Sequence, residues 1–394
     1  MNIKITRSAV IPDPIRISLY HKAPELGPKI LFFSGGSALN ELSQHLKNFT
    51  YNSIHLVTPF DSGGSSAKLR HAFDMPAIGD LRSRMVALAD ETVTGHPDVY
   101  RLFTHRLSIK ESQKVLLQQL TNMVEGKDPL IRAIPNPMRR LIRNLLGFFT
   151  GQVPDNFDLR GASIGNLALA GGYLNNHRHL DPVIFLFSKL VNVQGTVRAI
   201  VNDNFHLAAE LESGDILVGQ HRMTGKEVKP IKSRIKHILL SSHPDKYVPA
   251  VAKIRKKNRK LIQTADLICF PPGSFYSSLM ANLLPEGVIS AIASNENPKI
   301  FIPNLGIDPE QHGMTLKEVI NALLSVMQNA SPNAPTDTLL NYILLDSKNG
   351  KYSGPIPVAL NKKGITIIDT HLISPESSPY YDPFLLSNAI LSLV

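Results

Sequence analysis

A glycine- and serine-rich loop with one aspartate follows a short apolar stretch near residue 60. The loop is Asp61-Ser62-Gly63-Gly64-Ser65-Ser66, and Ile54 to Val57 before it is expected to form a buried strand that ends at Thr58-Pro59. The two glycines can adopt positive φ, and the hydroxyls and backbone N–H groups can surround a phosphate. Asp61, the one carboxylate of the loop, could hold a divalent cation against that phosphate. An ordinary surface turn has the same composition, so the loop alone leaves both interpretations open.

A second glycine turn follows the apolar run Lys29 to Phe33, which is typical of a central parallel strand. The turn is Ser34-Gly35-Gly36-Ser37, and a helical pattern runs from Leu39 to Leu46. Ser37 or Asn40 is expected to cap this helix, whose N-terminus would offer N–H groups and a positive dipole end to an anion. The turn lacks the full G-x-G-x-x-G dinucleotide fingerprint and the P-loop pattern.

A third turn, Pro271-Pro272-Gly273-Ser274, follows the expected strand Leu267 to Phe270. Ser274 is expected to cap the next helix, which runs through Leu283. The ring of Tyr276 could stack on a base or a sugar. Because the carboxyl ends of parallel strands meet at one edge of a sheet, the three turns are expected to face one crevice.

Other motifs carry weaker signals. Asp80 lies in the first turn of a helix expected to reach about Ala89, where it either favours the helix dipole or joins Arg82 in a site. Gly161-Ala162-Ser163-Ile164-Gly165 matches the nucleophile elbow of serine hydrolases. The match is interpreted as accidental, because a polar stretch rather than a buried strand precedes it. A tight turn into a helix from Asn166 to Leu174 is expected instead.

The composition predicts a folded protein with anionic partners. Hydrophobic residues make up 43% and charged residues 19% of the 394 residues, and 42 Lys plus Arg exceed 32 Asp plus Glu by ten. The lone Cys269 excludes an internal disulfide and a cysteine zinc site, and is expected to be buried. With no tryptophan and no aromatic residues among the basic segments, nucleic acid is not an expected partner. The basic residues gather in three places: Arg132, Arg139, Arg140 and Arg143; Arg222 to Lys236; and Lys253 to Lys260, on an expected helix from Pro249 to Gln263.

No stretch approaches the roughly 18 apolar residues of a membrane span, and the N-terminal residues lack a hydrophobic signal core. A cytoplasmic location is therefore expected. The basic, amphipathic segment Met138 to Phe149 is expected to pack onto the protein rather than to touch a membrane surface.

The order of the elements predicts an α/β fold, a Rossmann-like doubly wound and mostly parallel sheet. Residues 99–150 are expected to form a helical insertion within one domain that spans residues 1–394. Ile15 to Tyr20 alternates like an edge strand, Val197 to Leu240 is strand-rich, and Asp382 to Val394 is expected to be a closing helix.

The blocks named above, in this order and spacing, resemble the CofD-like family over most of the chain. That family includes 2-phospho-L-lactate transferase and the YvcK-type proteins known as gluconeogenesis factors. The matching blocks are Gly35-Gly36-Ser37, DSGGSSAKLR from Asp61, PAIGDLRSRMVAL from Pro76, GASIGNL from Gly161, PPGSFYSSLMANLL from Pro271, and Pro303-Asn304.

The resemblance implies a Rossmann-like domain with helical additions and a ligand that contains a nucleoside diphosphate. The transferase joins a phospholactyl group, delivered as a guanosine diphosphate derivative, to a deazaflavin alcohol with magnesium, whereas YvcK-type proteins bind UDP-sugars and regulate carbon use and cell shape. Both functions stay open for this chain, and a homodimer is compatible with either. Departures from the family pattern occur at Ser62, where a second aspartate is usual, and at Ser34, Ala38, Ala67 and Ala162.

With the resemblance, the expected site is assigned residue by residue. Asp61, helped by Asp80, is expected to be catalytic, and Asp61 is expected to bind Mg2+. Asn166, Tyr276 and Asn304 are expected to orient the base or the acceptor. The expected phosphate-binding residues are Gly35, Gly36, Ser37, Gly63, Gly64, Ser65, Ser66, Arg82, Gly273 and Ser274.

Overall fold

The central sheet of the computed structural model has seven strands in the order β10-β9-β8-β7-β1-β2-β3, and all neighbouring strands are parallel. The structure describes residues 8–92, 95–225, 227–357, 360 and 363–394. Chain order reverses between β1 and β7, the switch point at which doubly wound sheets bind ligands. The α/β prediction is therefore confirmed. The strands are β1 (Ile30–Ser34), β2 (Ile54–Val57), β3 (Thr196–Ala199), β7 (Leu267–Phe270), β8 (Lys299–Phe301), β9 (Tyr342–Leu345) and β10 (Thr366–Asp369).

Alternate residues of the central strands are buried on opposite faces of the sheet, as a period of two requires. Ile30, Phe32 and Cys269 contribute to the core beneath α2 (Asn40–Leu46) and α16 (Pro383–Leu391). Leu31, Phe33 and Ile268 contribute to the core on the other face. That second core is covered by α11 (Lys256–Gln263), α12 (Ala281–Leu283), α13 (Val288–Ala293), α14 (Leu316–Ala330) and α15 (Thr336–Leu339).

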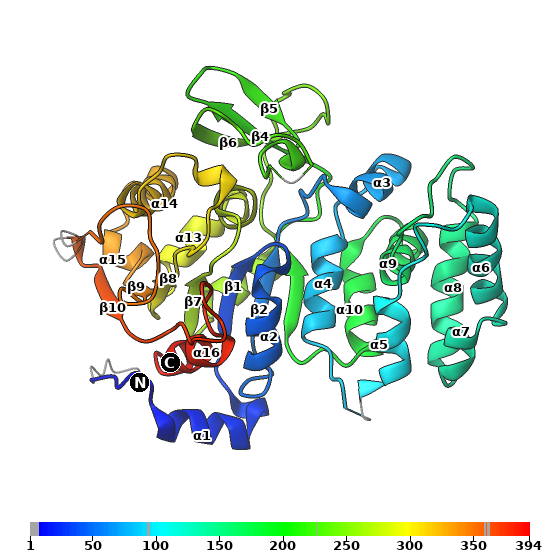
Figure 1. Cartoon of the computed structure of the whole chain (residues 1–394), viewed down its shortest axis with the longest axis horizontal. Coiled ribbons are helices and arrows are strands. Elements are labelled where there is room, and N and C mark those ends of the chain that lie inside the picture. The colour runs from blue at the N-terminus through cyan, green and yellow to red at the C-terminus, as the bar shows by residue number, and fades with distance from the viewer. Residues whose placement is uncertain (1–7, 93–94, 226, 358–359, 361–362) are drawn as a thin grey trace.

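A helical region packs beside the β2 and β3 edge of the sheet (Figure 1). Its helices α8 and α9 approach closely because Gly171 lies against the backbone of Leu145, where a Cβ would collide. The apolar side of Met138–Thr150 is buried there, so this segment packs onto the protein. No helix in the described ranges is long and apolar enough to span a membrane. The helices are α5 (Pro97–Thr104), α6 (Gln113–Glu125), α7 (Pro129–Ala133), α8 (Met138–Thr150), α9 (Ile164–Asn175) and α10 (Leu180–Leu190).

A small antiparallel sheet lies above the carboxyl ends of the central strands (Figure 1). It consists of β5 (Ile216–Val218), β4 (His206–Leu211) and β6 (Ile235–Ser241) in that order. Arg70 of α3 (Gly64–Phe73) joins it to the loop after β2. Its Nη1 donates to the carbonyls of Phe60 and Asp61 at 3.2 and 3.1 Å, and its Nη2 donates to the carbonyl of Phe205 at 2.7 Å. The small sheet is thus held against the loop Asp61 to Ser66, which we call the aspartate loop.

Three sequence predictions about elements were wrong or incomplete. The expected edge strand Ile15 to Tyr20 is a helix, α1 (Pro14–Lys22), because Pro14 occupies its first turn and the Asp13 carboxylate accepts a hydrogen bond from Arg16 N at 3.1 Å. The basic helix begins only at Lys256, and strand β9 was not anticipated. Within the basic segment 222–236, Lys226 lies outside the described residues.

Candidate functional site

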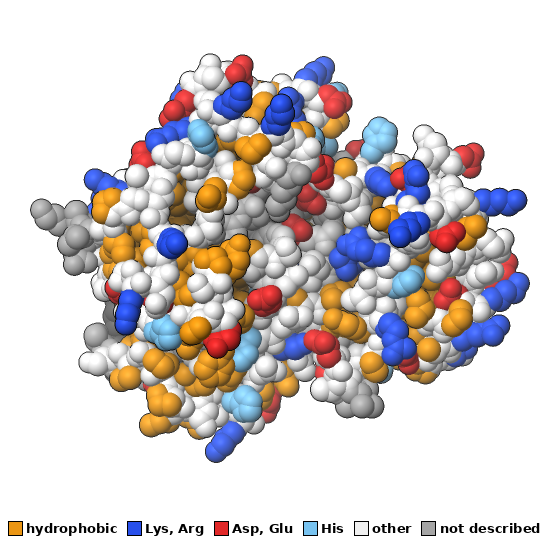
Figure 2. All heavy atoms as spheres, viewed as in Figure 1, with side chains coloured by type: hydrophobic (Ala, Val, Ile, Leu, Met, Phe, Trp, Pro, Cys, Tyr) orange, Lys and Arg blue, Asp and Glu red, His pale blue; other side chains and the backbone are white. Residues whose placement is uncertain are grey.

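A polar cavity of about 460 Å³ lies where the loops after β1, β2 and β7 meet α4 (Gly79–Ala87), and we call it the main cavity. Figure 2 shows this face hollowed, with acidic and basic side chains along the edges of the hollow. Most of the predicted site residues line the main cavity: Gly36, Ser37, Asp61, Gly63, Gly64, Ser65, Ser66, Asp80, Arg82, Asn166 and Ser274.

The aspartate loop makes a tight turn into α3. Gly63 N donates to Asp61 Oδ1 at 3.0 Å, which closes a local turn. Gly64 has a φ of 51° at the first residue of α3, a conformation that favours glycine. Gly64 N donates to Glu227 Oε1 at 2.7 Å. One N–H group at the N-terminus of α3 is therefore already hydrogen-bonded to a carboxylate of the protein. A phosphate at this helix end must therefore compete with Glu227.

The glycine turn after β1 is held by a fully buried arginine. Arg84 of α4 is 0% exposed, and its Nη2 donates to the Gly36 carbonyl at 3.0 Å. Its Nη1 donates to Ser43 Oγ of α2 at 2.7 Å. Burial lowers the pKa of Arg84 to about 10, while the nearby Asp80 carboxylate raises it, so the guanidinium is charged at neutral pH. The expected caps of α2, Ser37 and Asn40, do not act as caps: residue Leu39 precedes the helix and no side chain caps it.

Cations and one carboxylate share the side of the cavity formed by α4. Arg82 of α4 and Arg106, which follows α5, both line the cavity. Burial, and then repulsion from Arg106, lower the pKa of Arg82 to about 10. Asp80 attracts both Arg82 and Arg84 and raises the pKa of each. Asp80 therefore sits in a positive environment.

Asn166 lines the main cavity and has a buried amide oxygen without a partner in the described ranges. The residue is 1% exposed, its Nδ2 donates to Ser65 Oγ at 3.2 Å, and its Oδ1 has no partner in the described part of the chain. A buried amide oxygen without a donor costs free energy.

The third turn does not present its N–H groups to the main cavity. Phe275 N donates to Asp308 Oδ2, and Tyr276 N and Ser277 N donate to Glu310 Oε2, all at 2.8 Å. The first N–H groups of the helical segment that begins at Phe275 are thus hydrogen-bonded to two carboxylates of the protein. The Ser274 side chain does not cap this segment.

Four residues expected at the site do not line the main cavity: Gly35, Gly273, Tyr276 and Asn304. Tyr276 is 4% exposed and its hydroxyl donates to the Ile235 carbonyl, so its ring is part of the core and does not line the main cavity. Asn304 exchanges hydrogen bonds of 2.7 Å with the backbone of Gly273 and fixes the turn. Gly35 lies behind the turn, where a Cβ would collide with Ser278.

A second cavity of about 650 Å³ adjoins the main cavity at Ser37 and Ser274. Gly273 and Asn304 line this second cavity rather than the main one. Its wall is more apolar and includes Leu305, Ile307, Tyr380 and Tyr381. A compound with a charged and a planar or apolar part would fit across the two cavities.

The small sheet contributes residues that the sequence reasoning missed. The segment after β5 lines the main cavity with Gln220, His221, Thr224 and Glu227. Ser62 Oγ lies 2.9 Å from His221 Nδ1 and accepts from the backbone N–H of His221 at 3.2 Å. No motif marks these residues, because their place depends on how the small sheet docks. Ser277 and Ser278 also line the cavity. They lie within the block PPGSFYSSLMANLL, so the sequence could have predicted them as site residues.

The donor set of the main cavity is compatible with Mg2+ bound to a phosphate. No group of three or more His, Cys, Asp or Glu residues in the described ranges is arranged to hold a metal by itself. Asp61, Asp80 and Glu227 nevertheless line one cavity with several hydroxyls. Mg2+ commonly takes one or two carboxylates together with ligand phosphates and water. These residues fit that pattern.

Ser163 of the elbow-like motif has no nucleophilic arrangement. It is 0% exposed, and its Oγ donates to the Phe103 carbonyl at 3.4 Å. The motif forms the turn into α9, as the sequence predicted.

Comparison with known proteins identifies the family. The family model described as 2-phospho-L-lactate transferase CofD matches residues 30–373. The chain belongs to the CofD family. The match includes every loop of the main cavity, so the resemblance stated from the motifs is confirmed.

Curated relatives and a solved structure agree with this assignment. A gluconeogenesis factor of Halalkalibacterium halodurans is 28% identical over 75% of this chain and 72% of its own length. A gluconeogenesis factor of Bacillus subtilis is 28% identical over 72% of this chain and 69% of its own. The crystal structure of a UPF0052 family protein from Bacillus halodurans has a TM-score of 0.65 at 23% identity, and covers 92% of this chain and 99% of its own. This last likeness concerns the fold.

The first prediction concerns Glu310, whose pKa burial and the Asp308 carboxylate raise to about 7. Because the folded protein holds this proton more tightly than the unfolded chain, the contribution of Glu310 to stability is present below about pH 4.5 and is lost as pH rises through about 7. Glu310→Gln, which is always neutral, should lose this dependence. The measurement is urea unfolding of both proteins from pH 5 to 8. Glu125→Gln on the surface of α6 is the control, and parallel curves for wild type and Glu310→Gln would contradict the assignment.

The second prediction concerns Arg84. Arg84→Met should leave the carbonyls of Gly35 and Gly36 without a buried donor and lower the free energy of unfolding by about 3 kcal/mol. Arg101→Met, on an exposed face of α5, should change it by less than about 0.5 kcal/mol. Chemical denaturation measures both variants, and equal midpoints would refute the role of Arg84.

Proposed function

We propose that the main cavity binds a compound with a nucleoside diphosphate, and that the protein transfers the phospho-linked group of this compound with Mg2+. The carrying observation is the composition of the main cavity: a helix N-terminus with a glycine of positive φ, hydroxyls, the cation Arg82 and two aspartates at the switch point of the sheet. Membership of the CofD family supports a nucleotide-related ligand.

The base or the acceptor is assigned to the second cavity. Ser37 and Ser274 belong to both cavities, so a ligand with its diphosphate in the main cavity can extend past them. The wall formed by Leu305 and Tyr380 suits an aromatic ring, because a ring gains from burial against apolar and aromatic side chains. The sequence predicted that Tyr276 would contact the ring. The present proposal assigns the ring to residues near Tyr380 instead.

The proposed transfer needs little covalent chemistry from the protein. An acceptor hydroxyl forms a bond to the transferred phosphorus while the bond from that phosphorus to the bridging oxygen breaks, and the nucleoside monophosphate leaves. Asp80 is assigned to take the proton of the acceptor hydroxyl, and Arg82 and the N–H group of Gly64 stabilise the negative charge on the phosphate oxygens. Mg2+, held by Asp61 and ligand phosphate, would neutralise part of this charge.

A second candidate function is a regulator that binds a UDP-sugar without turning it over. Ser62, in the position where the family resemblance implies a second aspartate, favours it, because its hydroxyl is hydrogen-bonded to His221 and supplies no charge for a metal. The curated relatives named gluconeogenesis factors also favour it.

The test is a thermal-shift screen of GDP, UDP and UDP-sugars, each with and without Mg2+. A ligand at about 100 times its dissociation constant adds roughly 2.7 kcal/mol of stability. Stabilisation by a guanosine compound only with Mg2+ favours the transferase, and stabilisation by a UDP-sugar regardless of metal favours the regulator. A screen in which no nucleoside diphosphate stabilises the protein would overturn the proposal.

The third prediction separates metal binding from loop structure at Asp61. Asp61→Asn keeps an oxygen that can accept from Gly63 N, so the loop is expected to keep its shape while the charge is lost. The extra stabilisation that Mg2+ gives to the bound nucleotide should disappear in this variant. The control is Asp98→Asn on α5. Magnesium dependence that survives in Asp61→Asn would exclude Asp61 as a ligand.

The fourth prediction concerns competition by Glu227. Glu227→Gln replaces a charged acceptor of Gly64 N–H by a neutral one, and hydrogen bonds to charged groups are stronger by about 1 kcal/mol. Nucleoside diphosphates should therefore bind roughly fivefold more tightly to this variant. Glu212→Gln, an exposed change on the same small sheet, is the matched control. Calorimetric titration measures both, and weaker binding to Glu227→Gln would instead make Glu227 part of the ligand site.

A further inference from the structure

Helix α1 carries apolar side chains on two faces. Ile17 and Tyr20 pack against the core beneath α16, whereas Ile15 and Leu19, one turn apart on the outward side, are 74% and 61% exposed. We call Ile15 and Leu19 the ridge. A surface helix that packs on one side normally has a polar face toward solvent. The sequence of α1 is instead typical of a helix that packs on two sides, and a single chain covers one of them.

The inward contact of α1 is specific. Asp13 N donates to Ser392 Oγ at 2.8 Å, and Arg16 Nη1 donates to the carbonyls of Ser392 and Val394. These bonds fix α1 to the end of α16, so the ridge is held in a defined orientation. Both helices lie outside residues 30–373, the part of the chain that the family model matches. The ridge is therefore not part of the matched family domain.

A groove of about 500 Å³ lies beside the ridge, and we call it the α1 groove. Ile17, Phe49 and Phe384 contribute apolar surface to it, and Ser18 and His21 of α1 also line it. Because successive residues of an α-helix are about 100° apart, the ridge occupies the face of α1 next to the one that lines the groove. Two exposed aliphatic side chains thus adjoin a groove with an apolar lining.

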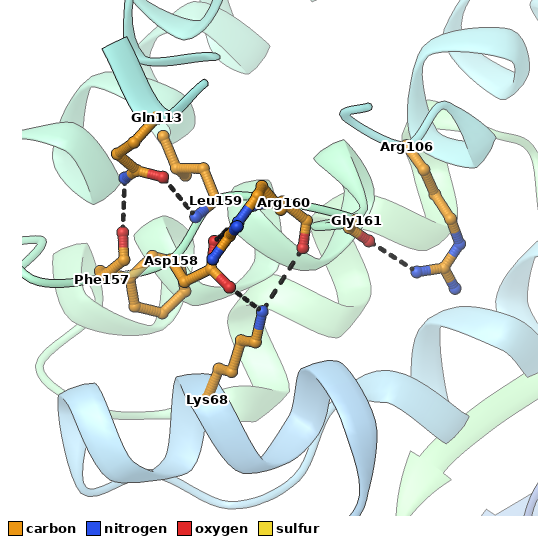
Figure 3. A network of polar contacts seen from close by, with 8 residues as sticks. All are labelled: Lys68, Arg106, Gln113, Phe157, Asp158, Leu159, Arg160 and Gly161. Carbon is orange, nitrogen blue, oxygen red and sulfur yellow. Dashed lines mark hydrogen bonds and ion pairs between the residues drawn. The ribbon is translucent and has the colours of Figure 1, made fainter. Parts of the chain in front are cut away.

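Polar side chains around the helical region, by contrast, have their partners within the chain. Lys68 of α3 and Arg160 each lie 2.8 Å from an oxygen of Asp158, and Gln113 of α6 donates to the Phe157 carbonyl at 2.6 Å (Figure 3). This part of the surface is complete in one copy of the protein. The ridge is left uncovered by the described part of the chain.

The charges of α1 favour a second copy of the same helix that runs in the opposite direction. Asp13 precedes the helix, and His21 and Lys22 lie in its last turn. Lys22 is exposed and has no ion pair within the described ranges. In an antiparallel pair, Lys22 of each copy approaches the Asp13 end of the other, and the two helix dipoles oppose each other favourably. A parallel pair would bring the two Lys22 side chains together.

We propose that α1 forms a two-fold interface with a second copy of this chain, in which the ridge of each copy enters the α1 groove of the other. A two-fold interface requires a surface that is complementary to itself. A ridge and a groove on adjacent faces of one helix meet this requirement, because helices pack by inserting the ridges of one into the grooves of the other.

The interface is separate from the main cavity. Figure 1 shows α1 at the lower edge of the molecule and the small sheet, which lies above the carboxyl ends of the central strands, at the upper edge. A second copy on α1 leaves the main cavity open. The inference therefore does not depend on the proposed function.

The oligomeric state of the full chain tests the proposal. Sedimentation velocity and light scattering over a range of concentrations should show a species of twice the 43.4 kDa of one chain. Leu19→Glu places a carboxylate in each of two identical contacts, so it should raise the dissociation constant of the dimer about a hundredfold, or about tenfold per contact. Val251→Glu, a change at a residue that is 71% exposed between β6 and α11, is the matched control and should leave the constant unchanged. Thermal unfolding checks that both variants are folded.

Cross-linking tests the geometry independently. Cys269 is fully buried, so a newly introduced surface thiol reports on its own position. Ser18 lies at the border between the ridge and the α1 groove, so Ser18→Cys should form a disulfide-linked dimer under mild oxidation. Ser108→Cys, exposed after α5, should not.

Two results would overturn the proposal. A wild type that stays monomeric would mean that something other than a second copy covers the ridge. A dimer that neither dissociates in Leu19→Glu nor cross-links through Ser18→Cys would mean that the copies associate through another surface.

Discussion

The buried guanidinium of Arg84 joins the elements on which the main cavity depends. It connects α4 to Ser43 of α2 and to the carbonyls of Gly35 and Gly36 after β1. A charge with no exposed surface is costly unless its hydrogen bonds are satisfied. Here neutral acceptors and the nearby Asp80 offset part of that cost, while Arg84 Nε has no partner in the described part of the chain. Since Asp80 and Arg82 lie on the same helix as Arg84, one buried contact sets the position of the glycine turn after β1, a carboxylate and a cation.

The three glycine turns differ in which side chains form hydrogen bonds with their backbone groups. At the third turn, Glu310 is 1% exposed and closes the helix N-terminus from inside the core, so this turn is structural. At the aspartate loop, Glu227 approaches Gly64 N from the small sheet at the edge of the cavity, where solvent and ligand can compete for the same N–H group. Turns of similar glycine and serine content therefore have different roles. The difference lies in which carboxylates other parts of the chain bring to each turn.

This contrast explains how far the sequence could predict the site. The strands and the turns after them were predictable, because apolar runs followed by glycine and serine are local signals, and the doubly wound sheet then places them at one edge. The buried position of Tyr276 was not predictable, because its hydroxyl donates to the Ile235 carbonyl in the small sheet, which is distant in sequence. Glu227 and His221 carry no local signal at all. The strand expected at Ile15 to Tyr20 failed for a local reason, since the Asp13-Pro14 start outweighs the alternation that follows it.

Ser62 bears most directly on whether the cavity catalyses or senses. Its Oγ accepts from the backbone N–H of His221 and lies 2.9 Å from His221 Nδ1. A serine used in this way ties the aspartate loop to the small sheet and adds no negative charge to the cavity. Arg70 and Glu227 tie the same two parts together. A phosphate that displaces Glu227 breaks one of these three ties, so ligand binding and the docking of the small sheet are energetically linked whether or not a group is transferred.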